Sequence, residues 1–181
     1  MKLTTAILTM TLLVLGATAA LAQRAASTKE LGTAYDMWSS GLYFDHALDH
    51  SRVLQNYSRY EQPVPPEIVR RHAEAIRSNL AAAKKSYAGL AEKHPDDKTA
   101  SGHLATLDAH HGDACESLDK LDAAAAGGNS DPKAVKEHSA GAIRSLRAAK
   151  MEHNKLMQHL GVEDTMGKGK GKSKRKADAA D

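Results

Sequence analysis

Apolar residues recur at alternating steps of three and four along most of the chain, which keeps their side chains on one face of a helix. Segments rich in proline, glycine and aspartate interrupt this pattern at residues 62–66, 94–97 and 126–132. A proline at residue 132 suits the first turn of a helix, and Gly161 suits the residue after a helix end. The pattern predicts four helices, over residues 28–60, 66–94, 97–126 and 132–160.

The apolar stripe of each helix is its predicted core face. On the first helix the stripe consists of Leu31, Tyr35, Trp38, Leu42, Val53, Tyr57 and Tyr60, and it passes through His46 and His50 or, one residue over, through Asp45 and Asp49. The other helices give more regular stripes, such as the one from Val69 through Ile76 and Leu80 to Leu90. Since the helices have similar lengths and short connections, we expect an all-α fold, an antiparallel up-down-up-down four-helix bundle.

The first 22 residues have the features of a secretory signal peptide. Lys2 precedes an apolar run at residues 6–15, and small residues at 20 and 22 mark a cleavage site before Gln23. The alternative is a membrane anchor, but a run of about ten residues falls short of the roughly 20 that a spanning helix needs. We expect residues 1–22 to be removed, residues 23–166 to form the bundle domain, and the protein to be periplasmic or secreted.

The last 15 residues, 167–181, combine six basic residues with glycine and only two acidic residues. No side chain larger than alanine is apolar there, so we expect a disordered tail. A basic tail can bind nucleic acid, but export argues against that partner. An anionic envelope surface or a simple gain in solubility fits an exported protein better.

Histidines occupy positions where the stripes predict core. Counting outward from the predicted loops places His72 and His138 in one layer of the bundle, His50 in the next and His46 in the one after. A buried imidazole left without partners costs about 1–3 kcal/mol. For any one of these histidines, a hydrogen-bonded core residue is the ordinary interpretation. Four imidazoles from three helices within three layers favour a different interpretation, in which the histidines bind a metal ion.

The clustered histidines predict a transition-metal site made from His46, His50, His72 and His138. Zinc and copper are the expected ions, because neutral imidazole nitrogens suit both. His46 and His50 stand one helical turn apart and can chelate one ion. Asp49 is the alternative carboxylate ligand. Asp45 can orient an imidazole by accepting a hydrogen bond from the ring nitrogen that does not bind the ion.

The third helix carries a weaker signal. His111 and Cys115 lie four residues apart and can form half of a site for a soft metal. Cys115 is the single cysteine, so it cannot form an internal disulfide. The alternative interpretation is that Cys115 is a small apolar filler of the core.

Several other chemistries are excluded or kept as alternatives. No glutamate has a histidine three residues later, which argues against a di-iron bundle, and one cysteine excludes covalent haem attachment. Non-covalent haem stays an alternative, with His153 beside Trp38 and Tyr87, or His111 among alanines, as the axial ligand. Neither a nucleophile elbow nor a glycine-rich phosphate loop is present, so we do not expect an enzyme.

A protein without a metal is the principal alternative. An exported bundle can act as an envelope stress chaperone or scaffold, and Tyr43 and Phe44, which lie off the first stripe, are an interface candidate for a client or a homodimer. A third possibility is pH sensing, in which protonated histidines loosen the bundle.

Overall fold

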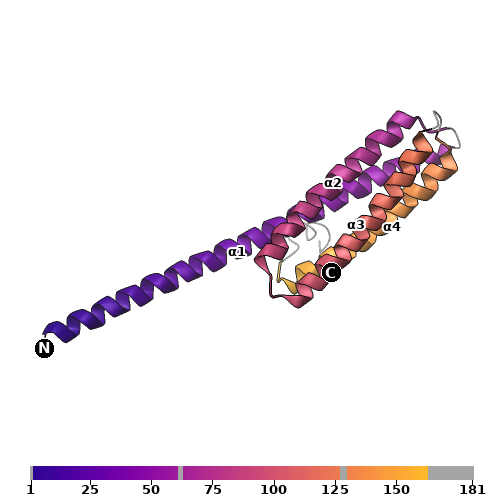
Figure 1. The fold of residues 1–181 in the computed structure, drawn as a ribbon. Coiled ribbons are helices and arrows are strands. Elements are labelled where there is room, and N and C mark those ends of the chain that lie inside the picture. Colours follow the sequence, from indigo (N-terminus) through magenta and orange to yellow (C-terminus); the bar gives the residue numbers. More distant parts are fainter. Residues whose placement is uncertain (1, 61–62, 127–129, 163–181) are drawn as a thin grey trace, which may run out of the picture.

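A computed structural model confirms the all-α four-helix bundle. It describes the backbone of residues 2–60, 63–126 and 130–162, and the side chains of these residues from Ala26 onward. The four helices run antiparallel to their neighbours along the chain (Figure 1). They are α1 (Lys2–Tyr57), continued by the short 3-10 helix η1 (Ser58–Tyr60), then α2 (Pro66–Lys93), α3 (Lys98–Ala125) and α4 (Pro132–His159).

Except at the start of α1, which was predicted at residue 28 and lies at Lys2, the helix ends lie within a few residues of the predicted ones, because local sequence fixes them. The side chain of Asp97 accepts a hydrogen bond from the backbone N–H of Ala100 at the start of α3, and Asp131 caps α4 through the N–H of Lys133. Pro66 and Pro132 occupy first turns, where no backbone donor is lost. Gly161 follows α4 with a φ of 67°, a conformation that glycine adopts without strain.

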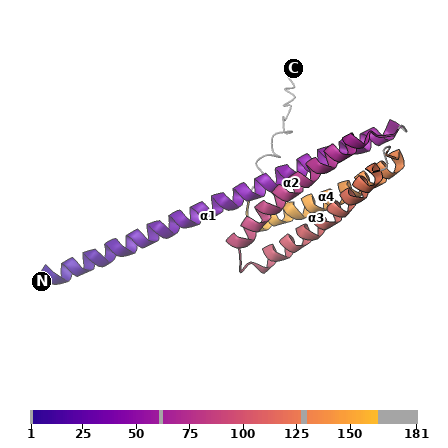
Figure 2. The same cartoon turned by 45° about the horizontal axis from the view of Figure 1, so that its top comes forward.

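The first helix is much longer than the other three and extends beyond them. Its N-terminal part projects away from the bundle in both views (Figures 1 and 2). The helix runs through the predicted cleavage position before Gln23, and the signal peptide stays a prediction. No helix among the described residues is both long and apolar enough to cross a membrane. The predicted tail, residues 167–181, lies outside the described residues.

Each helix of the bundle packs against two others. α1 lies against α2 and α4, and α3 lies against α4 and α2. At one end the two loops that precede α2 and α4 are joined, because the backbone N–H of Val64 donates to the carbonyl of Ser130 across 3.1 Å. The side chain of Val64 is buried beneath this link, which fixes the two loops to each other.

The predicted core faces of α2, α3 and α4 are confirmed. Large apolar side chains from all three stripes are buried, among them Val69, Ile76, Leu80, Leu90, Leu107, Leu118, Leu121, Val135, Leu146 and Leu156. Burial of such side chains stabilises the fold by about 1.5–3 kcal/mol each.

The predicted core face of α1 is wrong. Its stripe faces solvent, since the exposed fraction is 70% for Leu31, 69% for Tyr35 and 47% for Leu42. The face of α1 that packs in the bundle carries Met37, Phe44, Ala47, Leu48 and Leu54 together with three buried hydroxyl residues, Thr33, Ser40 and Ser51. Those small polar residues made this face look solvated in the sequence.

Tyr43 and Phe44 are consequently not an exposed aromatic pair. Phe44 is 1% exposed and packs against Tyr87, with ring centroids 5.8 Å apart, and against His153 at 6.1 Å. Tyr43 is half-buried against the same core. The interface that was expected at this pair is part of the bundle interior.

Candidate metal centre

Two of the predicted metal ligands meet between α1 and α2. The Nδ1 atoms of His50 and His72 lie 2.9 Å apart, so one ring donates its Nδ1–H to the lone pair of the other. Their ring centroids are 5.1 Å apart, with the ring planes at 52°. Both side chains are half-buried, which leaves the pair in reach of an ion from solvent.

The surroundings of His72 favour its neutral ring. Burial, followed by the nearby His50 and then Arg71, lowers the pKa of His72 below its usual value. A neutral imidazole keeps the lone pair that a metal ion needs, whereas a protonated one has none. His72 therefore offers a metal-binding nitrogen at neutral pH.

The other predicted ligands do not join the pair. His46 is exposed on α1, one turn before His50, and His138 is half-buried on α4. Asp49 is exposed and accepts a hydrogen bond from Arg52 across 2.8 Å. No group of three or more His, Cys, Asp or Glu side chains suited to an ion occurs among the described residues.

Asp45 has a different partner from the expected imidazole. Its carboxylate forms an ion pair with Lys150 of α4. This contact ties α1 to α4 along the side of the bundle. Asp45 lies there because α1 packs in the core through a different face from the predicted one, which directs Asp45 toward α4 instead of toward the histidines.

His111 and Cys115 lie on α3 and are both half-buried. His111 lines a cavity of about 210 Å³ together with Lys84, Tyr87 and Asp108. Burial raises the pKa of the Cys115 thiol, which disfavours the thiolate that binds metals. Cys115 packs against the core, as expected of a small apolar residue.

The histidine proposed for haem, His153, is 2% exposed and already bonded. Its Nε2 donates to the backbone carbonyl of Met37 across 2.8 Å and lies 3.1 Å from Oγ of Ser40. A different histidine, His94, lines a cavity of about 650 Å³ with Trp38 and Leu160. Haem binding stays a prediction.

Other histidines form polar links between helices that the sequence analysis missed. His103 on α3 donates its Nδ1–H to Glu152 on α4 across 2.6 Å, and His159 at the end of α4 donates to Asp97, 2.8 Å away. His94 of α2 bonds to the hydroxyl of Thr33 on α1 across 3.0 Å.

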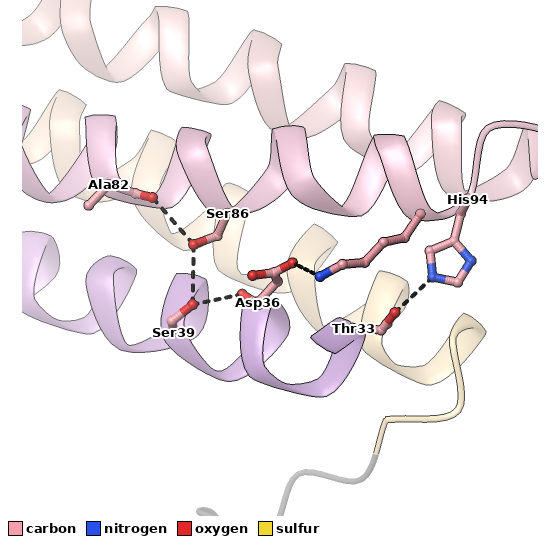
Figure 3. A network of polar contacts seen from close by, with 7 residues as sticks. Thr33, Asp36, Ser39, Ala82, Ser86 and His94 are labelled. Carbon is pink, nitrogen blue, oxygen red and sulfur yellow. Dashed lines mark hydrogen bonds and ion pairs between the residues drawn. The ribbon is translucent and has the colours of Figure 1, made fainter. Parts of the chain in front are cut away.

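The contact between His94 and Thr33 belongs to a row of polar contacts between α1 and α2 (Figure 3). Asp36 on α1 pairs with Lys93, and the hydroxyls of Ser39 and Ser86 lie 3.1 Å apart. Counting outward from the loops would have found these pairs, since the members of each lie at nearly equal distances from one connection.

Comparisons of the chain with models of protein families, with curated proteins and with solved structures found no match. Function must therefore be inferred from the residues of this chain and their arrangement.

Proposed function

We propose that this protein binds a transition metal ion through His50 and His72, for buffering, delivery or sensing and not for turnover. The observation that supports it is the 2.9 Å approach of two Nδ1 atoms from different helices. A single proton between two nitrogen lone pairs occupies the place that an ion would take.

Little movement is needed for the pair to hold zinc. Zinc–nitrogen bonds of about 2.0–2.1 Å at tetrahedral angles place two nitrogen ligands about 3.3 Å apart. The two rings would separate by about 0.4 Å from their present 2.9 Å. Half-buried side chains at the surface of two helices can make such a shift by small rotations.

The remaining ligands depend on the ion. Zinc prefers four ligands, so water and a further side chain would complete the set. His46, exposed one turn before His50, would have to turn toward the ion to do so. Cuprous copper accepts two imidazoles alone. Zinc and copper are therefore the two ions to test. Binding either ion for buffering, delivery or sensing requires no open coordination position and no general base, whereas catalysis would.

The proposal is tested by metal titration of the purified, untagged protein against a chromophoric chelator. We expect the variant His72→Gln, which keeps a polar side chain, to weaken zinc or copper binding at least tenfold. The matched control is His110→Gln on α3, a half-buried histidine far along the chain from the pair. Equal affinities of the wild type and His72→Gln would refute the site.

Export is part of the same proposal. A secreted or periplasmic metal carrier requires removal of residues 1–22, which the N-terminal pattern predicts. Mass spectrometry of the protein recovered from outside the cytoplasm should give a chain that starts at Gln23. A chain that retains Met1 and stays in the cytoplasm would contradict export without affecting the metal site.

A second candidate function, sensing of acid, is favoured by His153. Its ring is buried between α4 and α1, beside the Met37 carbonyl, Ser40 and Phe44, with Asn154 next to it on α4. The charges that face it are Lys150 and Asp45, which pair with each other. Protonation of this ring would place a net charge in the core, so acid should loosen the contact between α1 and α4.

A further inference from the structure

The solvent side of α1, extended by Tyr60 of η1, carries a row of exposed apolar residues, which we call the outer stripe. The exposed fractions are 70% for Leu31, 69% for Tyr35, 36% for Trp38, 47% for Leu42, 36% for Val53, 44% for Tyr57 and 78% for Tyr60. Exposed Asp49 and His46 interrupt it near its middle. A soluble helix normally presents charged or polar residues on such a face.

The outer stripe lies directly opposite the packed face of the same helix. Tyr35 and Val53 are each nine residues from Phe44, which is two and a half turns of an α-helix. Phe44 is 1% exposed in the core, so most of the stripe points away from α2, α3 and α4. At its N-terminal end, Leu31 and Trp38 also line the cavity that contains His94 and Leu160. Folding of the bundle therefore leaves this surface uncovered.

The area of the outer stripe matches what a stable dimer requires. At typical side-chain areas the seven residues expose roughly 700 Å². Two such faces would bury roughly 1,400 Å² in total, within the usual range of specific interfaces. Exposed apolar patches of this size generally mark a contact with another molecule.

We propose that two copies of this chain associate through their outer stripes, with the two α1 helices antiparallel. The stripe reaches from Leu31 to Tyr60, so its midpoint lies at residues 45–46. A two-fold axis there places Leu31 of one copy opposite Tyr60 of the other, and Tyr35 opposite Tyr57. The same axis places Trp38 opposite Val53, so every stripe residue except Leu42 meets an apolar partner, as a self-complementary interface requires.

Charge decides between the two orientations. Parallel helices in register would bring Asp49 against its own copy, at a position where the carboxylate is exposed within the stripe. Antiparallel helices place Asp49 opposite Leu42 and separate the two carboxylates. The opposed helix dipoles add a smaller contribution in the same direction.

The dimer does not require the proposed metal site, because His50 and His72 lie outside the stripe. His46 lies within the stripe and could also bind zinc, so the metal-free protein is used. Light scattering on the full chain at tens of micromolar should give twice the mass of one chain. The double variant Tyr35→Glu, Tyr57→Glu, which sets like charges across the interface, should halve that mass and keep its helical circular dichroism. The control is Met151→Glu, an apolar residue of α4 that is 62% exposed away from the stripe, and it should stay dimeric.

Cysteine cross-linking tests the orientation. In a Cys115→Ser background, His46→Cys lies beside the axis and should form a disulfide between copies under mild oxidation. Leu31→Cys alone should not, whereas a mixture of Leu31→Cys and Tyr60→Cys chains should. The interface would be overturned by a wild type that is monomeric, whatever else the stripe binds, or by a double variant that stays dimeric. Rapid formation of a disulfide between two Leu31→Cys chains would overturn the antiparallel arrangement.

Discussion

The Nε2 atom of His153 on α4 donates a hydrogen bond to the backbone carbonyl of Met37 on α1, 2.8 Å away. Because this nitrogen carries the proton, the ring can be neutral in the folded protein. Burial is the largest cause that lowers the pKa of His153. The bundle thus contains a histidine that resists protonation while it is folded.

This histidine makes the stability of the bundle depend on pH. In the unfolded chain its pKa returns to about 6.5, so the unfolded state takes up a proton below that pH and the folded state does not. The free energy of unfolding should therefore be fully retained above pH 6.5 and should fall as the pH drops below it. The expected slope is about 1.4 kcal/mol per pH unit for one such group. Urea unfolding at pH 8, 6 and 5 measures it.

A variant separates His153 from the other titrating groups. His153→Gln should be less stable at pH 8, since the ring also packs against Phe44, but its stability should change less between pH 8 and pH 5. The metal-free protein is used throughout. Parallel pH curves for the wild type and His153→Gln would assign the pH dependence to other residues.

Two glycines of the bundle should respond in opposite ways to alanine. A Cβ atom at Gly41 would stand 3.1 Å from Cε1 of His153, whose buried ring cannot retreat. A Cβ atom at Gly112 on α3 would meet nothing within 4 Å. Overpacking of about 1–3 kcal/mol should outweigh the roughly 1 kcal/mol that alanine gains in a helix, so we expect Gly41→Ala to lower the free energy of unfolding by up to about 2 kcal/mol. Gly112→Ala should raise it by about 1 kcal/mol because alanine favours the helix.

Thermal or urea unfolding of the two glycine variants at pH 8 makes the comparison. Both changes add the same methyl group inside a helix, so they differ only in what surrounds it. A stabilised Gly41→Ala protein would show that the contact between α1 and His153 is looser than the structure has it.

The buried serines of α1 should contribute little to stability. Ser51 is fully buried, and its hydroxyl donates to the carbonyl of Ala47 in the same helix. Because that bond is local, Ser51→Ala leaves no partner stranded and should change the free energy of unfolding by no more than about 0.5 kcal/mol. Leu54→Ala, one turn along the same face, should cost about 2–5 kcal/mol. A large loss for Ser51→Ala would mean that its hydroxyl supports a contact between helices.

These serines also explain why sequence predicted three core faces and not the fourth. On α2, α3 and α4 each helix has one apolar face, so periodicity alone identifies it. On α1 both sides are apolar, and the larger residues, such as Tyr35, lie outside while Ser40 and Ser51 lie inside. Hydroxyls that bond to their own helix can be buried at low cost, which a count of apolar residues does not register.

The candidate site could be predicted in part. Counting from the loop between α1 and α2 placed His50 and His72 one layer apart, and the structure brings them into direct contact. The positions of His46 and Asp45 depended on the face assigned to α1. Because a different face of α1 packs in the core, His46 is exposed and Asp45 pairs with Lys150. Register along antiparallel helices was thus the reliable signal, and the choice of face was not.

The most direct test of the metal site is to observe both imidazoles while zinc is added. Long-range proton–nitrogen NMR of the uniformly ¹⁵N-labelled chain at pH 8 reports the state of each ring nitrogen. We predict that the Nδ1 signals of His50 and His72 change together as zinc binds. Both rings should then carry their protons on Nε2, and the Nε2 signal of His153 should stay in place. Zinc binding that leaves the Nδ1 signals of His50 and His72 unchanged would contradict a metal site between α1 and α2.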